Sequence, residues 1–152
     1  MYRLVFLLLF SLFWGCQTTP ANEEEDLGYA KTYLQNSAAV DLAEAQLTAY
    51  NKRDLEAFLV PYGDSVKVFN DLEAFGYQGK ATMRENYKSW FSQVDSLHCT
   101  VVNRIATANT VIDHEEVVYR IAGKQELIRF EAIAIYKIGD EKIQEVHFVQ
   151  PQ

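Results

Sequence analysis

The chain has 152 residues, of which 49% are hydrophobic, so it is long and apolar enough to form one packed domain rather than a disordered segment. Its formal net charge of -7 argues against nucleic acid or an anionic membrane surface as the main partner, because both bind clusters of Lys and Arg.

Residues 1–15 have the pattern of a secretory signal peptide. Arg3 precedes an almost unbroken apolar run from Leu4 to Trp14. Eleven helical residues rise about 16 Å, short of the roughly 30 Å of a bilayer core, so the run predicts a cleaved leader rather than a membrane span.

The apolar run ends at Gly15 and Cys16, which resemble a bacterial lipobox. This resemblance implies that Cys16 is lipidated and that the protein is anchored in the cell envelope, in the outer membrane or facing the periplasm. The alternative is an ordinary signal peptide followed by an incidental cysteine.

Residues 16–36 are predicted to form a tether between the lipid and the domain. They contain a proline, a glycine and the acidic run Glu23 to Asp26, and such a segment buries little apolar surface.

The chain has two cysteines. If Cys16 carries a lipid, Cys99 has no partner for an internal disulfide, and its place in an apolar alternation predicts a buried structural thiol.

Helical spacing predicts three helices, interrupted by one strand and one loop. The first helix is capped by Ser37, and its apolar face consists of Val40, Ala43, Leu47 and Tyr50. The next predicted elements are a short helix that Asp54 caps and that ends at Leu59 before Pro61, a strand over Val66–Phe69, a loop with Gly76 and Gly79, and a helix over Lys80–Gln93.

The second half of the chain changes to an alternating pattern with a period of two residues. This pattern predicts four strands over Leu97–Thr107, Thr110–Ala122, Gln125–Ile138 and Lys142–Gln150. Loops of two or three residues join antiparallel neighbours, so these strands are expected to form a meander. Helices followed by an antiparallel sheet predict an α+β fold.

Four local motifs accompany this order of elements: Ala49-Tyr50-Asn51-Lys52-Arg53-Asp54, Gln78-Gly79-Lys80, Val111-Ile112-Asp113-His114-Glu115, and Ala134-Ile135-Tyr136 before a Gly-Asp turn. Together they resemble the SnoaL-like branch of the nuclear transport factor 2-like superfamily over about residues 40 to 149. The resemblance implies that residues 37–152 form a cone-shaped domain, in which a curved antiparallel sheet wraps around the helices. The activity stays open, because this fold hosts isomerases, cyclases, dehydratases, hydrolases and proteins without chemistry.

Ketosteroid isomerase, a catalytic relative in this superfamily, uses an Asp base and an oxyanion hole made of a Tyr and a protonated Asp. Alignment of the elements places Gln46 at the Tyr position, Asn70 at the base and Ala134 at the protonated Asp. Asn cannot abstract a proton and Ala cannot donate one, so that mechanism is not expected here. Asp71 is the substitute base if the strand register shifts by one residue.

Three neighbouring residues, Asp113, His114 and Glu115, are the candidate catalytic groups. Alternation places Asp113 and Glu115 on one strand face and His114 on the other. A carboxyl group inside the cone would have a raised pKa and suit general acid/base catalysis. Alternatively, these charges lie on a solvated or dimer-facing side and pair with Arg120, Arg129 or Lys137. The sequence favours the second interpretation, because structural ion pairs are commoner than active sites.

An apolar face on one strand is the candidate wall of a ligand cavity, and the small side chains of Ala132 and Ala134 between Phe130 and Tyr136 would leave room there. The other candidate ligand-binding residues are Tyr50, Asn70, Trp90 and Phe148. Ordinary aromatic core packing explains the same residues.

The three histidines, His98, His114 and His147, have no metal-ligand spacing, and we find no nucleophile motif or phosphate-binding loop, so neither a metal nor a cofactor is predicted. Three functions remain: a module that binds a small apolar or amphipathic molecule, an acid/base enzyme of the isomerase, cyclase or dehydratase type, and a non-catalytic lipoprotein that dimerises through its convex sheet. The sequence favours the binding module, since the one mechanism that can be aligned loses all three of its groups.

Overall fold

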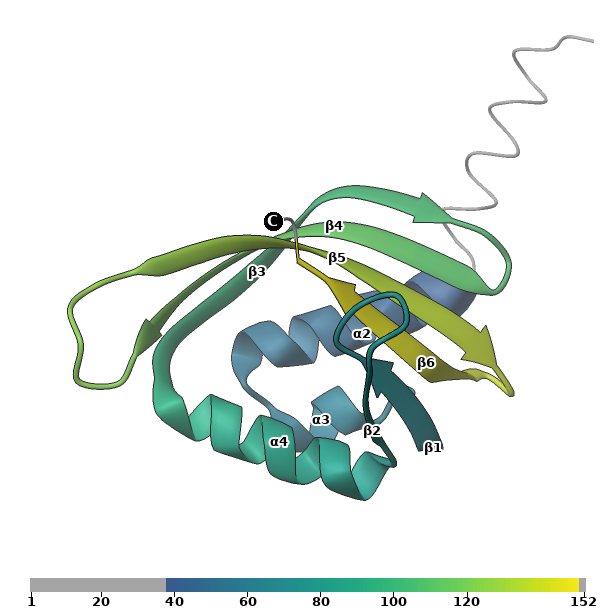
Figure 1. Ribbon diagram of the computed structural model, residues 1–152, viewed down its shortest axis with the longest axis horizontal. Coiled ribbons are helices and arrows are strands. Elements are labelled where there is room, and N and C mark those ends of the chain that lie inside the picture. Colours follow the sequence, from purple (N-terminus) through teal and green to yellow (C-terminus); the bar gives the residue numbers. More distant parts are fainter. Residues whose placement is uncertain (1–37, 151–152) are drawn as a thin grey trace, which may run out of the picture.

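The structure, a computed structural model, describes residues 38–150 (Figure 1). The predicted signal peptide, Cys16, the tether and the Ser37 cap lie outside these residues. The elements in chain order are α2 (Ala38–Lys52), α3 (Leu55–Leu59), β1 (Tyr62–Phe69), β2 (Phe75–Gln78), α4 (Lys80–Gln93), β3 (Val94–Ala106), β4 (Thr110–Ile121), β5 (Ile128–Gly139) and β6 (Lys142–Val149).

The strands form one six-stranded sheet in the order β2-β1-β6-β5-β4-β3. Strands β3 to β6 form the expected antiparallel meander. Strand β1 pairs with β6 in parallel, so the sheet is mixed and not wholly antiparallel as predicted. Strands β1 and β6 are not joined by a short hairpin. The chain passes through β2, α4 and the other three strands of the meander before β6 returns beside β1, and this long connection allows the parallel pairing.

Strand β2 is a second correction, since this segment was predicted to be a loop. Gly76 and Gly79 read as turn residues, but Phe75–Gln78 pairs with β1 in an antiparallel hairpin. Gly79 takes a positive φ of 97°, which glycine adopts readily, and directly precedes α4. The backbone hydrogen bonds with β1 therefore outweigh the weak strand propensity of Gly76.

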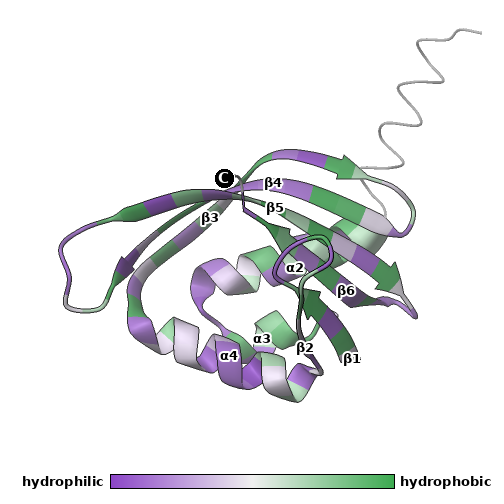
Figure 2. Ribbon diagram, in the orientation of Figure 1, coloured by the Kyte–Doolittle hydropathy of each residue, from purple (hydrophilic) through white to green (hydrophobic). Residues whose placement is uncertain are grey.

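The three helices lie on the concave side of the curved sheet and close the cone (Figure 1). Hydrophobic and hydrophilic residues alternate along the long strands (Figure 2), and every second residue is buried over much of β4 and β5. The buried core includes Ala39, Ala43 and Ala49 of α2, whose small side chains let this helix approach Val111 and Ala134 of the sheet. Cys99 is buried beside this core, as predicted.

Asp54 caps α3 as predicted, because its Oδ1 accepts a hydrogen bond from the backbone N–H of Ala57 at 3.1 Å. Among the described helices, none combines the length and apolar character needed to cross a membrane.

Candidate functional site

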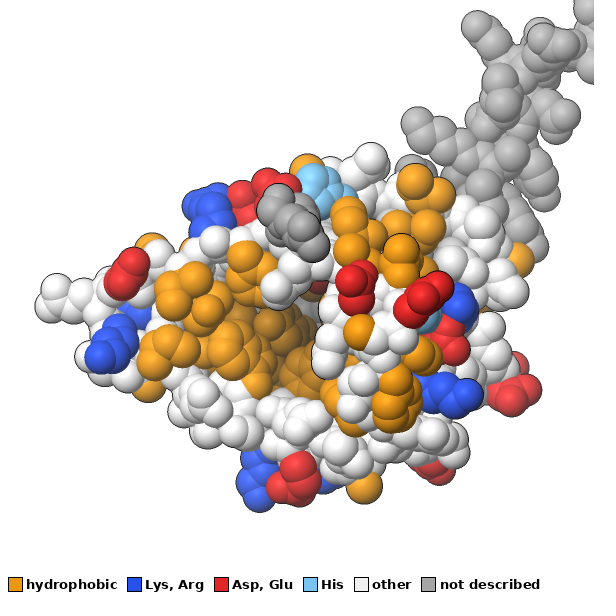
Figure 3. Space-filling model, in the orientation of Figure 1, with side chains coloured by type: hydrophobic (Ala, Val, Ile, Leu, Met, Phe, Trp, Pro, Cys, Tyr) orange, Lys and Arg blue, Asp and Glu red, His pale blue; other side chains and the backbone are white. Residues whose placement is uncertain are grey.

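The cone contains a pocket between the concave sheet face and the helices. One part has a volume of about 300 Å³ and opens to solvent, where hydrophobic side chains gather around a hollow (Figure 3). A second part of about 250 Å³ shares Tyr50, Tyr87, Phe130 and Phe148 with it and continues to Glu115. We call both parts together the cone pocket. Its other lining residues are Val68, Asn70, Tyr77, Asn86, Trp90, Val117, Tyr119, Ala132 and Gln150.

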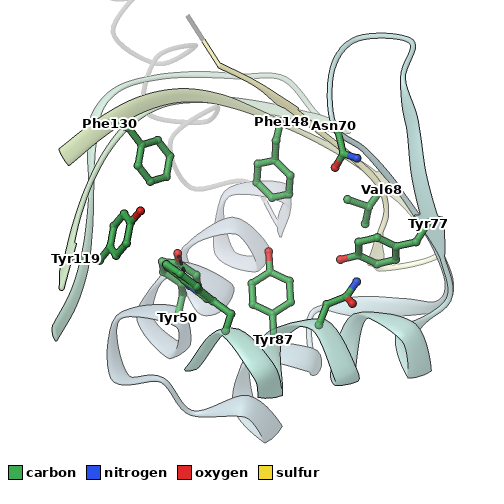
Figure 4. Close-up of a pocket in the computed structure, with 10 residues that line it drawn as sticks. Tyr50, Val68, Asn70, Tyr77, Tyr87, Tyr119, Phe130 and Phe148 are labelled. Atoms are coloured by element: carbon green, nitrogen blue, oxygen red, sulfur yellow. Dashed lines mark hydrogen bonds between the residues drawn. The ribbon is translucent and has the colours of Figure 1, made fainter. Parts of the chain in front are cut away.

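Aromatic side chains form most of the lining of the first, solvent-open part and surround a central space (Figure 4). They meet edge to face: the ring centroids of Trp90 and Tyr119 are 5.0 Å apart at 70°, and those of Tyr50 and Tyr87 are 6.2 Å apart at 80°. The indole N–H of Trp90 also donates to the Tyr50 hydroxyl at 3.1 Å. Because the rings hold one another in place, the space between them is preformed.

Glu115 lies at the inner wall of the cone pocket and is 6% exposed. The Tyr136 hydroxyl donates to its Oε1 at 3.0 Å. The Gln46 amide donates to the Tyr136 oxygen at 2.9 Å, and the Tyr62 hydroxyl donates to the Gln46 carbonyl at 3.3 Å. This chain of buried hydrogen bonds runs from β1 through α2 and β5 to β4, and it fixes the position of the carboxyl group.

The pKa of Glu115 is raised from its ordinary value of 4.5 to about 7. Burial is the largest cause and the charge of Asp113 adds to it, while hydrogen bonds from Tyr136 and Cys99 and the charge of Arg104 oppose it. Burial also holds the pKa of Tyr136 well above its usual value, so its hydroxyl stays a donor at neutral pH. Glu115 is therefore placed to exchange a proton with a molecule in the pocket near pH 7.

Asp113, two residues before Glu115, is held differently. Its side chain is fully buried, and both of its oxygens accept from the Arg104 guanidinium, at 2.6 Å from Nε and 2.7 Å from Nη2. Arg104 also pairs with Glu44 of α2. Asp113 does not line the cone pocket, so this bidentate pair is a structural clamp between α2, β3 and β4.

Residues 43–146 match the family model described as the SnoaL-like domain. The chain belongs to the SnoaL-like domain family. No curated protein matches the chain. Structures with the same fold include a cystatin-fold protein from Novosphingobium aromaticivorans (21% identity, TM-score 0.68, 75% of this chain and 98% of that one).

Two further neighbours come from Mycobacterium tuberculosis. One is described as an LEH-like epoxide hydrolase (14% identity, TM-score 0.65, 75% of this chain and 83% of that one). The other is RV0760c in complex with estradiol-17beta-hemisuccinate (12% identity, TM-score 0.65, 74% of this chain and 93% of that one). These similarities show the cone-shaped α+β fold.

In this SnoaL-like domain Asp113 and Glu115 both face the inside of the cone, so the interpretation of a solvated or dimer-facing side is wrong. The expected cationic partners lie on the outer face and pair elsewhere: Arg120 with Asp95, Arg129 with Glu116, and Lys137 with Glu145. The helices cover the concave face, and this burial is the physical reason for the difference.

His114 points to the outer face, where its Nε2 lies 3.1 Å from a carboxylate oxygen of Glu131. The structure therefore does not bring His114 together with Glu115. Asp71, the substitute base, is exposed, and its Oδ1 accepts from the N–H of Leu72. Among residues 38–150, no three His, Cys, Asp or Glu side chains converge as a metal site would require.

Of the candidate ligand-binding residues, Tyr50, Asn70, Trp90, Phe130 and Phe148 line the cone pocket. Ala134 and Tyr136 are fully buried and do not line it; Tyr136 reaches the pocket only through its hydrogen bond to Glu115. Of the two small residues that the sequence offered, Ala132 lines the space and Ala134 does not. The sequence analysis missed Tyr119, Asn86 and the clamp residue Arg104, although Tyr119 shares the alternation of Glu115.

Proposed function

We propose that the domain binds a small, mainly apolar molecule in the cone pocket and that Glu115 acts on it as a general acid or base. The observation that carries the proposal is the Glu115 carboxyl group at the pocket wall. Glu115 is 6% exposed, the Tyr136 hydroxyl orients it, and the pKa of Glu115 is raised to about 7. Such a group is about half protonated at neutral pH, which suits it both to remove and to return a proton.

The geometry favours an isomerase, cyclase, dehydratase or hydrolase type of reaction. Tyr136 already donates to Glu115, and Trp90 already donates to Tyr50, so neither is a free donor for a developing oxyanion. Among the described lining residues Glu115 is the carboxyl group, with a pKa of about 7, so the proposal assigns to it the proton transfer to or from carbon or a water molecule. The fold neighbours described as an epoxide hydrolase and as a complex with a steroid ester fit a pocket of this kind.

The test uses Glu115→Gln and a panel of small apolar ketones and epoxides. In D2O, NMR measures deuterium uptake beside the ketone carbonyl and opening of the epoxide. Loss of a positioned acid/base group is expected to lower the rate by about 100-fold or more. Glu116→Gln is the matched control, because Glu116 is the next residue on β4 but pairs with Arg129 on the outer face. Equal rates for wild type and Glu115→Gln across the panel would contradict the acid/base role.

A second variant tests binding without touching the carboxyl group. Ala132→Leu adds three carbon atoms at the pocket wall, so it is expected to abolish binding of pocket ligands, while urea denaturation still shows a cooperative fold. Ala134→Leu is the contrasting variant: it overpacks the core beneath the pocket and is expected to cost about 1–3 kcal/mol of stability. Unchanged ligand affinity in Ala132→Leu counts against the pocket as the binding site.

We also propose that the protein is lipid-anchored in the cell envelope through Cys16, on the strength of the apolar leader and the lipobox resemblance. Cys16→Ser is expected to abolish labelling with a fatty-acid analogue and to release the protein from membranes. Continued labelling of this variant would show that Cys16 is not the modified residue.

A homodimer through the convex sheet face is a further part of the proposal. Ile105, Ile112 and Ile135 lie directly opposite one another on three adjacent strands of that face, and Ile105 is 61% exposed. Apolar stripes of this kind favour association. Sedimentation is expected to show a dimer for wild type and a monomer for Ile112→Glu, and a monomeric wild type would contradict it.

A further inference from the structure

We propose that the ligand of the cone pocket carries a substituted ammonium group, which the aromatic rings surround and for which Glu115 is the counter-ion. This inference rests on the binding half of the function proposed above and not on proton transfer. It names the chemical class of the ligand: an organic cation with an apolar body.

The described lining of the cone pocket is rich in aromatic rings and contains no positively charged side chain. Among the described residues that line the cone pocket, none is Lys, Arg or His. Seven of these lining residues are aromatic: Tyr50, Tyr77, Tyr87, Trp90, Tyr119, Phe130 and Phe148. The faces of such rings attract a cation, most strongly where water is displaced. In Figure 4 the hydroxyl groups of Tyr77 and Tyr87 also point toward the central space, where their lone pairs would face an ammonium group.

Among residues 38–150, no Lys, Arg or His side chain forms an ion pair with Glu115. Arg104, whose positive charge lowers the pKa of Glu115, already holds both oxygens of Asp113 and also pairs with Glu44. The groups that bond to Glu115, the Tyr136 hydroxyl and the Cys99 thiol, are neutral. An ionised Glu115 therefore adds a negative charge that the protein leaves uncompensated, and a bound cation would balance it.

The titratable and charged groups that act on Glu115 come from six elements. They are Tyr50 on α2, Tyr62 on β1, Tyr87 on α4, Cys99 and Arg104 on β3, Asp113 on β4, and Tyr136 on β5. The tyrosines and the thiol keep their protons at neutral pH, because burial raises their pKa values. The pKa of Glu115, about 7, places its change of charge near neutral pH.

A cation that prefers ionised Glu115 must therefore bind more tightly as pH rises. Below the raised pKa the carboxyl group is neutral and offers only a dipole, whereas above it the full charge is available. The affinity is expected to increase between pH 6 and pH 8 and then to level off. The affinity of an uncharged ligand of the same shape is expected to fall with rising pH or to stay constant. The reason is that ionised Glu115 needs water or a cation beside it, and an uncharged ligand supplies neither.

The experiment compares choline with 3,3-dimethylbutan-1-ol, in which carbon replaces the quaternary nitrogen. Calorimetric titration of the full chain at pH 6 and pH 8 measures both affinities. Choline is expected to bind about tenfold more tightly than the alcohol at pH 8, with a smaller advantage at pH 6. Glu115→Gln should lose this advantage and its pH dependence, and Glu116→Gln, on the outer face, should keep both. Phe130→Leu, which retains an apolar side chain without the ring, should weaken choline more than the alcohol.

The possible outcomes separate this inference from the proposed function. If the alcohol binds as tightly as choline and Ala132→Leu abolishes both, the pocket binds small molecules and the cation inference is overturned. If neither probe binds at millimolar concentration, the cation inference is overturned, while the proton-transfer test on ketones and epoxides still decides the proposed function. A choline preference that survives in Glu115→Gln would overturn the role of Glu115 as counter-ion.

Discussion

Arg104→Met is expected to destabilise the domain by about 3–5 kcal/mol, the cost of leaving a buried charge without its partner. Asp113 is fully buried, and Arg104 supplies both of the hydrogen bonds to its carboxylate oxygens described above. Methionine fills a similar space without a charge. The loss of stability in Arg104→Met therefore measures the removal of the ion pair with Asp113 rather than the creation of a cavity. Urea denaturation at pH 7 measures the difference in the free energy of unfolding.

Two further variants show whether the clamp is the cause. Arg120→Met removes an arginine from the same sheet, but Arg120 and Asp95 are each about 40% exposed, so a loss below about 1 kcal/mol is expected. The double variant Arg104→Met with Asp113→Leu removes the orphaned charge and should recover most of the stability. A single Arg104→Met variant as stable as Arg120→Met would show that the pair does not hold Asp113 in the fold.

The second large effect concerns pH. Glu115 has a pKa of about 7 in the folded protein and returns to 4.5 in the unfolded chain. The folded state therefore binds the proton more tightly between these values. The stability from protonated Glu115 is fully present below about pH 4.5 and is lost as pH rises through about 7. Glu115→Gln, which stays neutral, should match the wild type at pH 4 and be about 3 kcal/mol more stable at pH 8.

The comparison between variants is needed because other carboxyl groups change with pH in the opposite direction. Hydrogen bonds from Arg84 to Glu56, and from Lys137 and His147 to Glu145, lower the pKa of those groups. Their contributions are the same in wild type and Glu115→Gln, so they cancel in the difference. A difference that does not change between pH 4 and pH 8 would contradict a raised pKa at Glu115. A stability gain at pH 8 would also indicate that the carboxyl group is kept for function.

Much of the fold follows from local patterns in the sequence. The change from helical to alternating periodicity marks the boundary between α4 and the meander, and Asp54 marks the start of α3 because its side chain bonds to the backbone three residues later. Strand β2 does not follow from the sequence, because its pairing with β1 decides its conformation and two glycines conceal it. The signal peptide and the lipid anchor stay predictions.

The candidate site depends on a detail of register that no local pattern reveals. Cys99 of β3 faces inward, and strict alternation from it would put Arg104 on the outer face. A register shift between Val101 and Asn103 inserts one residue, so Arg104 lies opposite Asp113 and meets it inside the cone. The sequence therefore offered Arg120, Arg129 and Lys137 as partners for the carboxylates, whereas the bulge supplies the actual one.

The burial of Glu115 also comes from long-range packing. Alternation groups Glu115 with Asp113, Val117 and Tyr119, but it does not say which face of the strand the helices cover. Gln46 and Tyr62, which complete the hydrogen-bond chain through Tyr136, are 69 and 53 positions away from Glu115 along the sequence. Only the closed cone brings them together.

The central claim is that Glu115 is a pocket carboxyl group that exchanges its proton near neutral pH. The most direct test is an NMR pH titration of the carboxyl carbons of the glutamates in the full chain, with Glu115→Gln used to assign the Glu115 signal. This signal is expected to titrate with a pKa of about 7 and to shift when a pocket ligand binds. A Glu115 signal that titrates near its ordinary value of 4.5 would contradict the account.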